Sequence, residues 1–339
     1  MTPFVRIATL LAAALPLAAG PDPVAIRFAP AEGTTWTKTF ESSMELEFEA
    51  MSVVMDGNEV PTEYLPIFDI QSQDVERLVF TDHYVAVGEG RARVLRRRFD
   101  TIEVERDLTF EMSGMAEASS TSHGSGTSGL EDRTVVFTWD DDDAEYEVRW
   151  TGGDGDDALL LGLVADVDLR ALLPDEAVAI GDSWEVSWDG HGLLLEPGGD
   201  LHVELEGENL EAFEHPEDGE TMDGSAFLRL VAVEAEEGAR IAVIEIEGRF
   251  TVSAEGPGDL DDVPVADGDA TVATTLAVEF EGELRWDLAA GMLRSLEVTG
   301  ETELTVVTTK DPGQPGPEFE STMWMTGSFR QSLATELVE

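Results

Sequence analysis

The feature that most constrains this fold is an alternation of apolar and polar residues with a period of two. In residues 276–286, apolar side chains stand at alternate positions, and Glu or Arg fills most positions between them. The same alternation runs through 44–49, 201–205, 244–252 and 296–306. A period of two places successive side chains on opposite faces of a strand. The pattern predicts antiparallel strands with one buried and one solvated face, and therefore an all-β fold.

The charge of the chain follows from this pattern, because the acidic residues gather at the solvated positions. There are 72 acidic and 20 basic residues, giving a net charge of −52 at pH 7, while 42% of the residues are hydrophobic. This balance argues against partners with a phosphate backbone and against anionic lipid surfaces. It also keeps exposed strand edges of different molecules apart. With no cysteine, disulfides, thiolate nucleophiles and Cys-ligated metals are excluded.

Residues 1–20 have the pattern of a secretory signal peptide. Arg6 is their only charge, an apolar run follows over 7–17, and Ala18, Ala19 and Gly20 close the segment. The run is too short for a permanent membrane helix, and no later stretch has about 20 consecutive apolar residues. Pro21 stands where a lipoprotein signal needs Cys. We therefore expect an exported protein, periplasmic or extracellular, soluble and not lipid-anchored.

Three short motifs recur in the same order at nearly one spacing, which predicts an internal duplication. Gly33-Thr34-Thr35-Trp36 returns as Gly181-Asp182-Ser183-Trp184, 148 residues later. The segment 90–94 returns at 238–242, and 138–140 returns at 285–287. We infer a first β unit over 21–150 and a second over 174–339. The connector over 151–173 contains acidic residues followed by good helix formers, which predicts a short helix at 157–165.

Two segments resemble known families. Leu173-Pro174 with Val178-Ala179-Ile180-Gly181-Asp182-Ser183-Trp184, and the later segment 286–295 (WDLAAGMLRS), resemble uncharacterised exported β-rich families of Gram-negative bacteria. Such families often resemble the half-barrels of periplasmic lipoprotein carriers. The resemblance implies a curved antiparallel sheet with an apolar concave face partly closed by helices. With the duplication, it predicts two tandem curved sheets or half-barrels with one short connecting helix.

A cluster of arginines stands out in the acidic chain. Alternation places Arg91 and Arg93, with Arg97, on one face of a strand and Arg96 and Arg98 on the other. The cluster is a candidate binding site for an anion or an acidic partner. The alternative is pairing with carboxylates of neighbouring strands.

The tryptophans and one run of aspartates supply the other candidates. Trp36 with Trp184, and Trp139 with Trp286, occupy equivalent places in the two units, which favours a core role. The remaining three are candidates for a ligand-facing aromatic: Trp150, Trp188 and Trp324. The run Asp140, Asp141, Asp142 and Asp143 is either a solvated hairpin turn or a calcium site.

These patterns predict a non-enzymatic exported β protein of the cell envelope. We expect it to bind an apolar ligand or lipid, or a partner protein, on its sheet faces. The alternatives are a secreted hydrolase and a calcium-dependent structural or interaction protein. No catalytic residue can be assigned, because carboxylate pairs are too numerous to single one out. Apart from calcium, no cofactor is expected.

Overall fold

The computed structural model describes residues 22–113, 118–152, 155–189, 197–207, 221–259, 269–310 and 317–338. The predicted signal peptide lies outside them and stays a prediction. Within this part of the chain the secondary structure is almost entirely antiparallel strand, which confirms the all-β prediction. Three short 3-10 helices accompany the strands, at Thr62–Tyr64, Asp157–Leu160 and Arg170–Leu172. No described helix has the length and hydropathy needed to cross a membrane.

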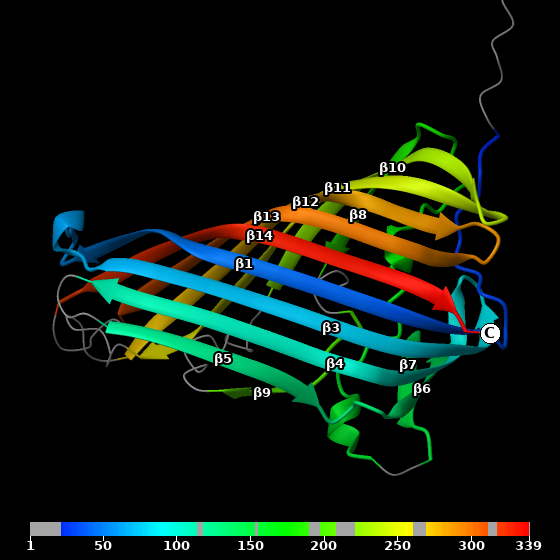
Figure 1. The fold of residues 1–339 in the computed structure, drawn as a ribbon, viewed down its shortest axis with the longest axis horizontal. Helices are drawn as coiled ribbons and strands as arrows, with labels where there is room; N and C mark the ends of the chain where they lie inside the picture. The colour runs from blue at the N-terminus through cyan, green and yellow to red at the C-terminus, as the bar shows by residue number, and fades with distance from the viewer. Residues whose placement is uncertain are drawn as a thin grey trace, which may run out of the picture.

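All strands belong to one sheet, in which β1 at the start of the fold pairs with β14 at its end (Figure 1). The order is β7-β6-β4-β3-β1-β14-β13-β12-β11-β10-β8, with β2 beside β1, and β5 between β4 and β9. The bounds are β1 Thr35–Met55, β2 Asn58–Glu59, β3 Ile67–Gly88, β4 Arg91–Ser113, β5 Ala118–Ser128, β6 Thr134–Asp140, β7 Glu145–Trp150, β8 Ser183–Asp189, β9 Val203–Gly207, β10 Thr221–Glu236, β11 Ala239–Asp259, β12 Asp269–Asp287, β13 Met292–Lys310 and β14 Phe319–Leu337. The two predicted β units thus join in one curved sheet, and the boundary between them stays a prediction.

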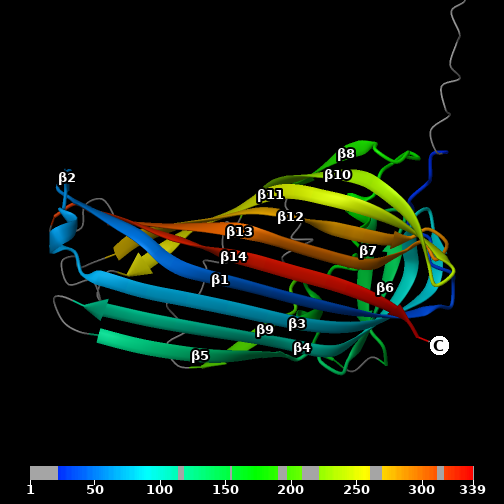
Figure 2. The same cartoon turned by 45° about the horizontal axis from the view of Figure 1, so that its top comes forward.

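The long strands lie side by side along the long axis of the molecule (Figures 1 and 2). A strand rises about 3.3 Å per residue, so one the length of β3 extends about 70 Å. We call the end that holds β6, β7 and the C terminus the closed end, and the opposite end, where β2 lies, the far end (Figure 2). The face that carries Leu78 and Phe80 is the inner face, and the face that carries most of the glutamates is the outer face.

The main core fills the inner face at the closed end. The N-terminal segment contributes Ile26 and Phe28, and the connector contributes Val167 and Leu172, all at most 4% exposed. The helix predicted at 157–165 is shorter than expected. It covers Asp157–Leu160, where the Asp156 carboxylate accepts from the Ala158 N–H at 3.0 Å. Residues 161–169 of the connector form no helix, and Leu163, Ala165, Val167 and Leu169 of this segment pack in the core before the short helix Arg170–Leu172.

Glycines on the inner face let aromatic rings lie flat against the sheet. Phe280 pairs directly with Gly248 on one side and Gly300 on the other. A Cβ on Gly248 would lie 2.6 Å from the Phe280 ring, and one on Gly300 would lie 2.3 Å from the Glu279 carbonyl oxygen. Glycine inside a strand marks such close approaches and allows tight sheet curvature.

The tryptophans expected to be equivalent differ in burial. Trp36 and Trp286 are 8% and 0% exposed, whereas Trp184 and Trp139 are partly buried. Trp184 donates through Nε1 to the Leu172 carbonyl at 2.9 Å, and the Trp139 ring lies 3.9 Å from the Arg91 guanidinium carbon. Trp139 and Trp286 thus sit in different surroundings, and the duplication remains a prediction from the sequence.

Candidate functional site: the inner face of the sheet

The inner face carries three zones between the closed end and the far end. Cross-strand register defines them, because residues paired across neighbouring strands lie at one level. Nearest the closed end is a buried charge network of Lys38, Asp82, Tyr84, Arg97 and Asp168. A polar band follows, made of Ser72, Asp74, Glu76, Arg106, Ser122 and Thr302. An apolar belt comes last, made of Met222, Val252, Leu276, Leu304, Met325, Phe48, Phe68, Ile70 and Phe110.

The charge network joins three strands to the connector. Lys38 on β1 contacts the carboxylates of Asp82 and Asp168 at 2.7 Å each, and donates to the Tyr84 hydroxyl at 2.8 Å. The Tyr84 hydroxyl donates to Asp168 at 2.7 Å. These side chains are at most 3% exposed. Two cations face two carboxylates, so the network is formally neutral, as a buried ionic cluster must nearly be.

Arg97 connects this network to the connector backbone. Its Nε and Nη2 donate to the two oxygens of Asp82 at 2.8 and 2.9 Å, a bidentate arrangement. Its Nη1 and Nη2 also donate to the carbonyls of Val164 and Ala165, each at 2.9 Å. Arg97 therefore fixes the position of the connector over the sheet.

Burial and charge act in opposite directions on the two carboxyl groups of the network. Burial works to raise the pKa of Asp82, but the charges of Arg97 and Lys38 outweigh it and hold that pKa below its ordinary value. Burial also works to raise the pKa of Asp168, where Lys38 opposes it only in part, and this pKa lies above its ordinary value. Burial raises the pKa of Tyr84 well above its ordinary value, so this hydroxyl stays a donor.

The arginine cluster is divided between the two faces, and not as expected. β3 and β4 shift register between Tyr84 and Ala86 and again before Val87. Such a bulge turns the side chains before it to the other face, so Arg91 and Arg93 do not share a face with buried Arg97. Arg93 pairs with Glu89 and Asp141, and Arg98 pairs with Asp100 and Asp132, while Arg96 is exposed. Most of the cluster is paired internally, and it forms no single basic surface.

The polar band contains an ion pair of its own, separate from the charge network. Arg106 on β4 lies directly across from Asp74 on β3, and its Nε donates to the carboxylate at 2.8 Å. Their side chains are 22% and 38% exposed. Ser122 and Thr302 stand on one cross-strand row with Ser72, and both have buried hydroxyl oxygens without a hydrogen-bond partner among the described residues. Buried polar groups left in this way are uncommon.

The apolar belt lies on the far-end side of the polar band. Cross-strand pairing links six adjacent strands through Met222, Val252, Leu276, Leu304, Met325 and Phe48. On the other side, the rings of Phe48 and Phe68 are 5.9 Å apart, and those of Phe68 and Phe110 are 6.0 Å apart. Most of the belt is only partly buried. Within the described residues, the cluster formed by its central members comes from five adjacent strands, β4, β3, β1, β14 and β13.

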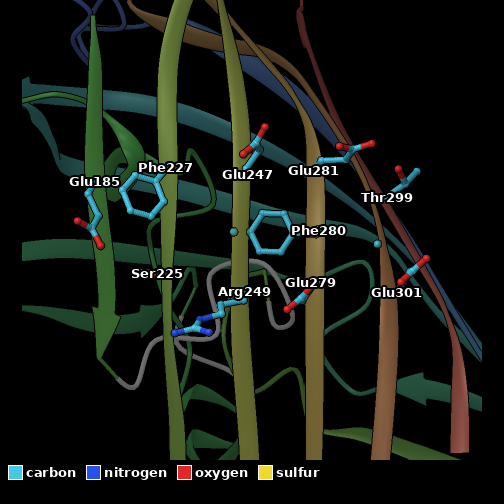
Figure 3. A pocket seen from close by; sticks show the side chains of 12 residues that line it. Glu185, Ser225, Phe227, Glu247, Arg249, Glu279, Phe280, Glu281, Thr299 and Glu301 are labelled. Carbon is cyan, nitrogen blue, oxygen red and sulfur yellow. The ribbon is translucent and has the colours of Figure 1, made fainter.

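The outer face holds a broad hollow of about 810 Å³ over β8 to β13 (Figure 3). One cross-strand row in it runs through Glu185, Phe227, Glu247, Glu281 and Thr299. Phe227 is 56% exposed between two glutamates. The hollow is acidic, and the described residues contain no group of three or more side chains able to hold a metal ion.

The remaining candidates from the sequence do not come together. Trp150 packs on the main core, with the Arg133 guanidinium 5.6 Å from its ring, whereas Trp324 is 36% exposed on the outer face. The backbone of Trp188 pairs with Gly224, and its side chain lies outside the described residues.

The aspartate run forms the turn between β6 and β7. The Asp140 carboxylate accepts from the Asp142 N–H at 2.8 Å, and Asp141 pairs with Arg93. These contacts are those of a hairpin turn, and calcium binding stays an untested alternative.

Sequence reasoning named Arg97 as a binding candidate but missed the rest of the charge network and the polar band, although their signal was present. Lys38 occupies a position between Trp36 and Phe40 where the alternation of its strand calls for an apolar residue. Arg106 likewise stands between Val104 and Leu108. A charged residue at the buried phase of an alternating strand points either to a buried ion pair or to a functional surface.

Comparisons with known proteins assign no family. No family model and no curated protein matches the chain. An outer membrane channel from Pseudomonas putida F1 aligns with 93% of this chain and 100% of its own, at 9% identity and a TM-score of 0.17. OccK7 (OpdD) of Pseudomonas aeruginosa aligns with 90% of this chain and 99% of its own, at 7% identity and a TM-score of 0.16. These scores are too low to carry an argument about function. The class defined by the structure is an all-β protein with one curved antiparallel sheet, and the resemblance to lipoprotein carriers stays an expectation.

Proposed function

We propose that this chain is an exported, non-enzymatic binding protein of the cell envelope, and that it takes up an apolar ligand or acyl chain on the apolar belt. The observation that carries the proposal is the belt itself, a continuous row of apolar side chains on the inner face, most of which are partly exposed. Export is proposed from the signal-peptide pattern of residues 1–20.

The composition of the belt suits a flexible apolar ligand. Burying apolar surface is favourable by roughly 25 cal/mol per Å², so partly exposed Phe and Leu side chains gain from being covered. Phe48, Phe68 and Phe110 form a tilted aromatic series. Met222 and Met325 add unbranched, polarizable side chains that adapt to ligands of different shape.

The charge network is not placed to act on a bound ligand. Its acid and base groups contact one another and the connector backbone, and they are enclosed by the main core. A general acid or base must reach the substrate within hydrogen-bond distance. Lys38, Asp82, Tyr84 and Asp168 therefore serve the fold.

The test is fluorescence titration with a neutral apolar probe, N-phenyl-1-naphthylamine. We expect saturable binding with a blue shift. Leu304→Glu places a charge in the belt, and should weaken binding about tenfold or more because burying a charge beside an apolar ligand is costly. Thr305→Glu, on the outer face of the same strand, is the matched control and should bind as the wild type does. Absence of saturable binding by the folded wild-type protein would refute the proposal, whatever the variants do.

A further inference from the structure

We infer that the ligand is a zwitterionic phospholipid-type amphiphile, held with its phosphate at Arg106 and its chain along the apolar belt. The inference rests on the proposed function, and it specifies the head group. Its starting point is the juxtaposition of the two zones: on β4, Arg106 is followed on the same face by Leu108 and then Phe110. A ligand that reaches both zones has one polar end and one apolar end.

Arg106 has hydrogen-bonding capacity left for a ligand. Its Nε donates to Asp74 at 2.8 Å, and this is its one polar contact among the described residues. The Nη1 and Nη2 groups therefore remain as donors on a side chain that is 22% exposed. The planar fork of a guanidinium matches two oxygens of a phosphate or carboxylate, and such charge-assisted hydrogen bonds are the strong ones.

The surrounding charges favour a head group that carries both signs. Asp74 and Glu76 lie on the same inner face, so two carboxylates accompany one guanidinium. The whole chain carries −52. A simple anion would meet repulsion from both carboxylates. A phosphate joined to an ammonium group places its anion at Arg106 and its cation near Asp74 and Glu76.

The dimensions and an unpartnered hydroxyl agree with an amphiphile. The belt crosses neighbouring strands that lie about 4.8 Å apart, so the five strands of its central cluster, β4, β3, β1, β14 and β13, span about 19 Å, which is close to the length of a long acyl chain. Ser122 on β5, 2% exposed and with a hydroxyl oxygen that has no partner among the described residues, pairs with Leu108, the next inner-face residue after Arg106 on β4. Its position suits a contact with the ester region next to a phosphate head.

The experiment measures head-group selectivity with three probes: dodecylphosphocholine below its micelle concentration, dodecanoate, and the neutral N-phenyl-1-naphthylamine. We expect the wild type to bind dodecylphosphocholine more tightly than dodecanoate. Arg106→Gln should weaken dodecylphosphocholine about tenfold or more, because it removes a charge-assisted hydrogen bond, and leave the neutral probe unchanged. Asp74→Asn should strengthen dodecanoate relative to dodecylphosphocholine.

The control is Arg77→Gln, which removes an outer-face arginine of β3 that pairs with Glu41 and Glu103, and it should change none of the three affinities. If the neutral probe binds but Arg106→Gln leaves the affinity for dodecylphosphocholine unchanged, the inference is overturned and the proposed function stands. Tighter binding of dodecanoate by the wild type also overturns it. If none of the three probes binds, the proposed function is refuted, and this inference with it. Should Arg106→Gln not fold, two measurements still test the inference: the preference of the wild type for dodecylphosphocholine over dodecanoate, and the change of that preference in Asp74→Asn.

Discussion

Lys38 is one of two lysines in the chain, and it lies fully buried between two carboxylates. A buried ion pair is no general source of stability, since desolvation offsets much of the attraction. Its geometry is nevertheless directional: Lys38, Arg97 and Tyr84 reach partners on β3 and on the connector. The network holds the connector backbone in one position over the closed end of the sheet. Apolar packing alone would fix that position less specifically.

Removing one member of the network should be costly. Lys38→Met leaves Asp82 and Asp168 without their shared cation, and we expect a loss of about 3–5 kcal/mol in the free energy of unfolding. Urea unfolding at pH 7 measures it. Arg77→Met removes an exposed pair and should cost less than about 1 kcal/mol. Equal effects for the two variants would contradict a structural role of the network.

The two carboxyl groups should respond to pH with opposite signs. The folded-state pKa of Asp82 is lowered, so its stabilisation is present above its unfolded value of about 3.9 and disappears as the pH falls below it. The stability gap between wild type and Asp82→Asn should therefore shrink in acid. The folded-state pKa of Asp168 is raised, so its contribution is present in acid and disappears as the pH rises through that pKa. The difference in unfolding free energy between the wild type and Asp168→Asn should therefore shrink as the pH rises. Parallel pH profiles from urea unfolding would contradict the assignment.

At the scale of the element, the long strands depend on local exceptions to their alternation. The bulge in β3 and β4 decides which arginine is buried, because it changes the phase of the strand between Ala92 and Leu95. Inner-face glycines beside Phe280 let neighbouring strands approach closely. These exceptions set the curvature of the sheet and therefore the shape of its inner face.

A methyl group at Gly300 should disturb this curvature. In Gly300→Ala the new Cβ would lie 2.3 Å from the Glu279 carbonyl oxygen and 3.0 Å from the Phe280 Cβ. Backbone must move to accommodate it, so we expect a loss of about 1–3 kcal/mol in unfolding free energy. In the control Gly88→Ala, the nearest atoms belong to the flexible Arg93 side chain at 3.5 Å, and the change should be within about 0.5 kcal/mol. A tolerated Gly300→Ala would show that the sheet relaxes freely there.

At the scale of the whole molecule, the first and last long strands, β1 and β14, are neighbours in the interior of one open sheet. β1 pairs with β14 over most of its length, so strands more than 260 residues apart in sequence are neighbours. Contacts of this separation cost loop-closure entropy before they contribute stability. The chain has a net charge of −52, and many of its glutamates lie on the outer face of this one sheet, where like charges lie across from one another, as Glu247 does from Glu281.

The melting temperature should therefore rise with salt. The screening length falls from about 30 Å at 0.01 M to about 3 Å at 1 M ionic strength, which weakens repulsion along the outer face. Differential scanning calorimetry in NaCl across this range measures the effect, with the uncharged solute sucrose as the control for general solute effects. A melting temperature that stays constant in NaCl would mean that local ion pairs already balance the charge.

Much of the fold could be predicted from particular residues. The alternation in 276–286 and 296–306 corresponds to β12 and β13, and the turn residues of Asp140 to Asp143 separate β6 from β7. For the site, the sequence predicted only that an apolar sheet face would bind the ligand, and not which residues form it. Arg106 and Asp74 are 32 residues apart and meet because β3 and β4 form a hairpin with one particular register.

Between bulges, the sequence by itself determined which side chains share a face, because a period of two needs no knowledge of neighbouring strands. It therefore determined the all-β class and the acidic outer face. Only the tertiary structure decided which strands are neighbours, where the bulges lie and how far the connector covers the inner face. Those depend on register and curvature, which arise from contacts between distant segments. That is why Lys38 became part of a buried network while Arg106, at the same kind of position, stayed at the boundary of the apolar belt.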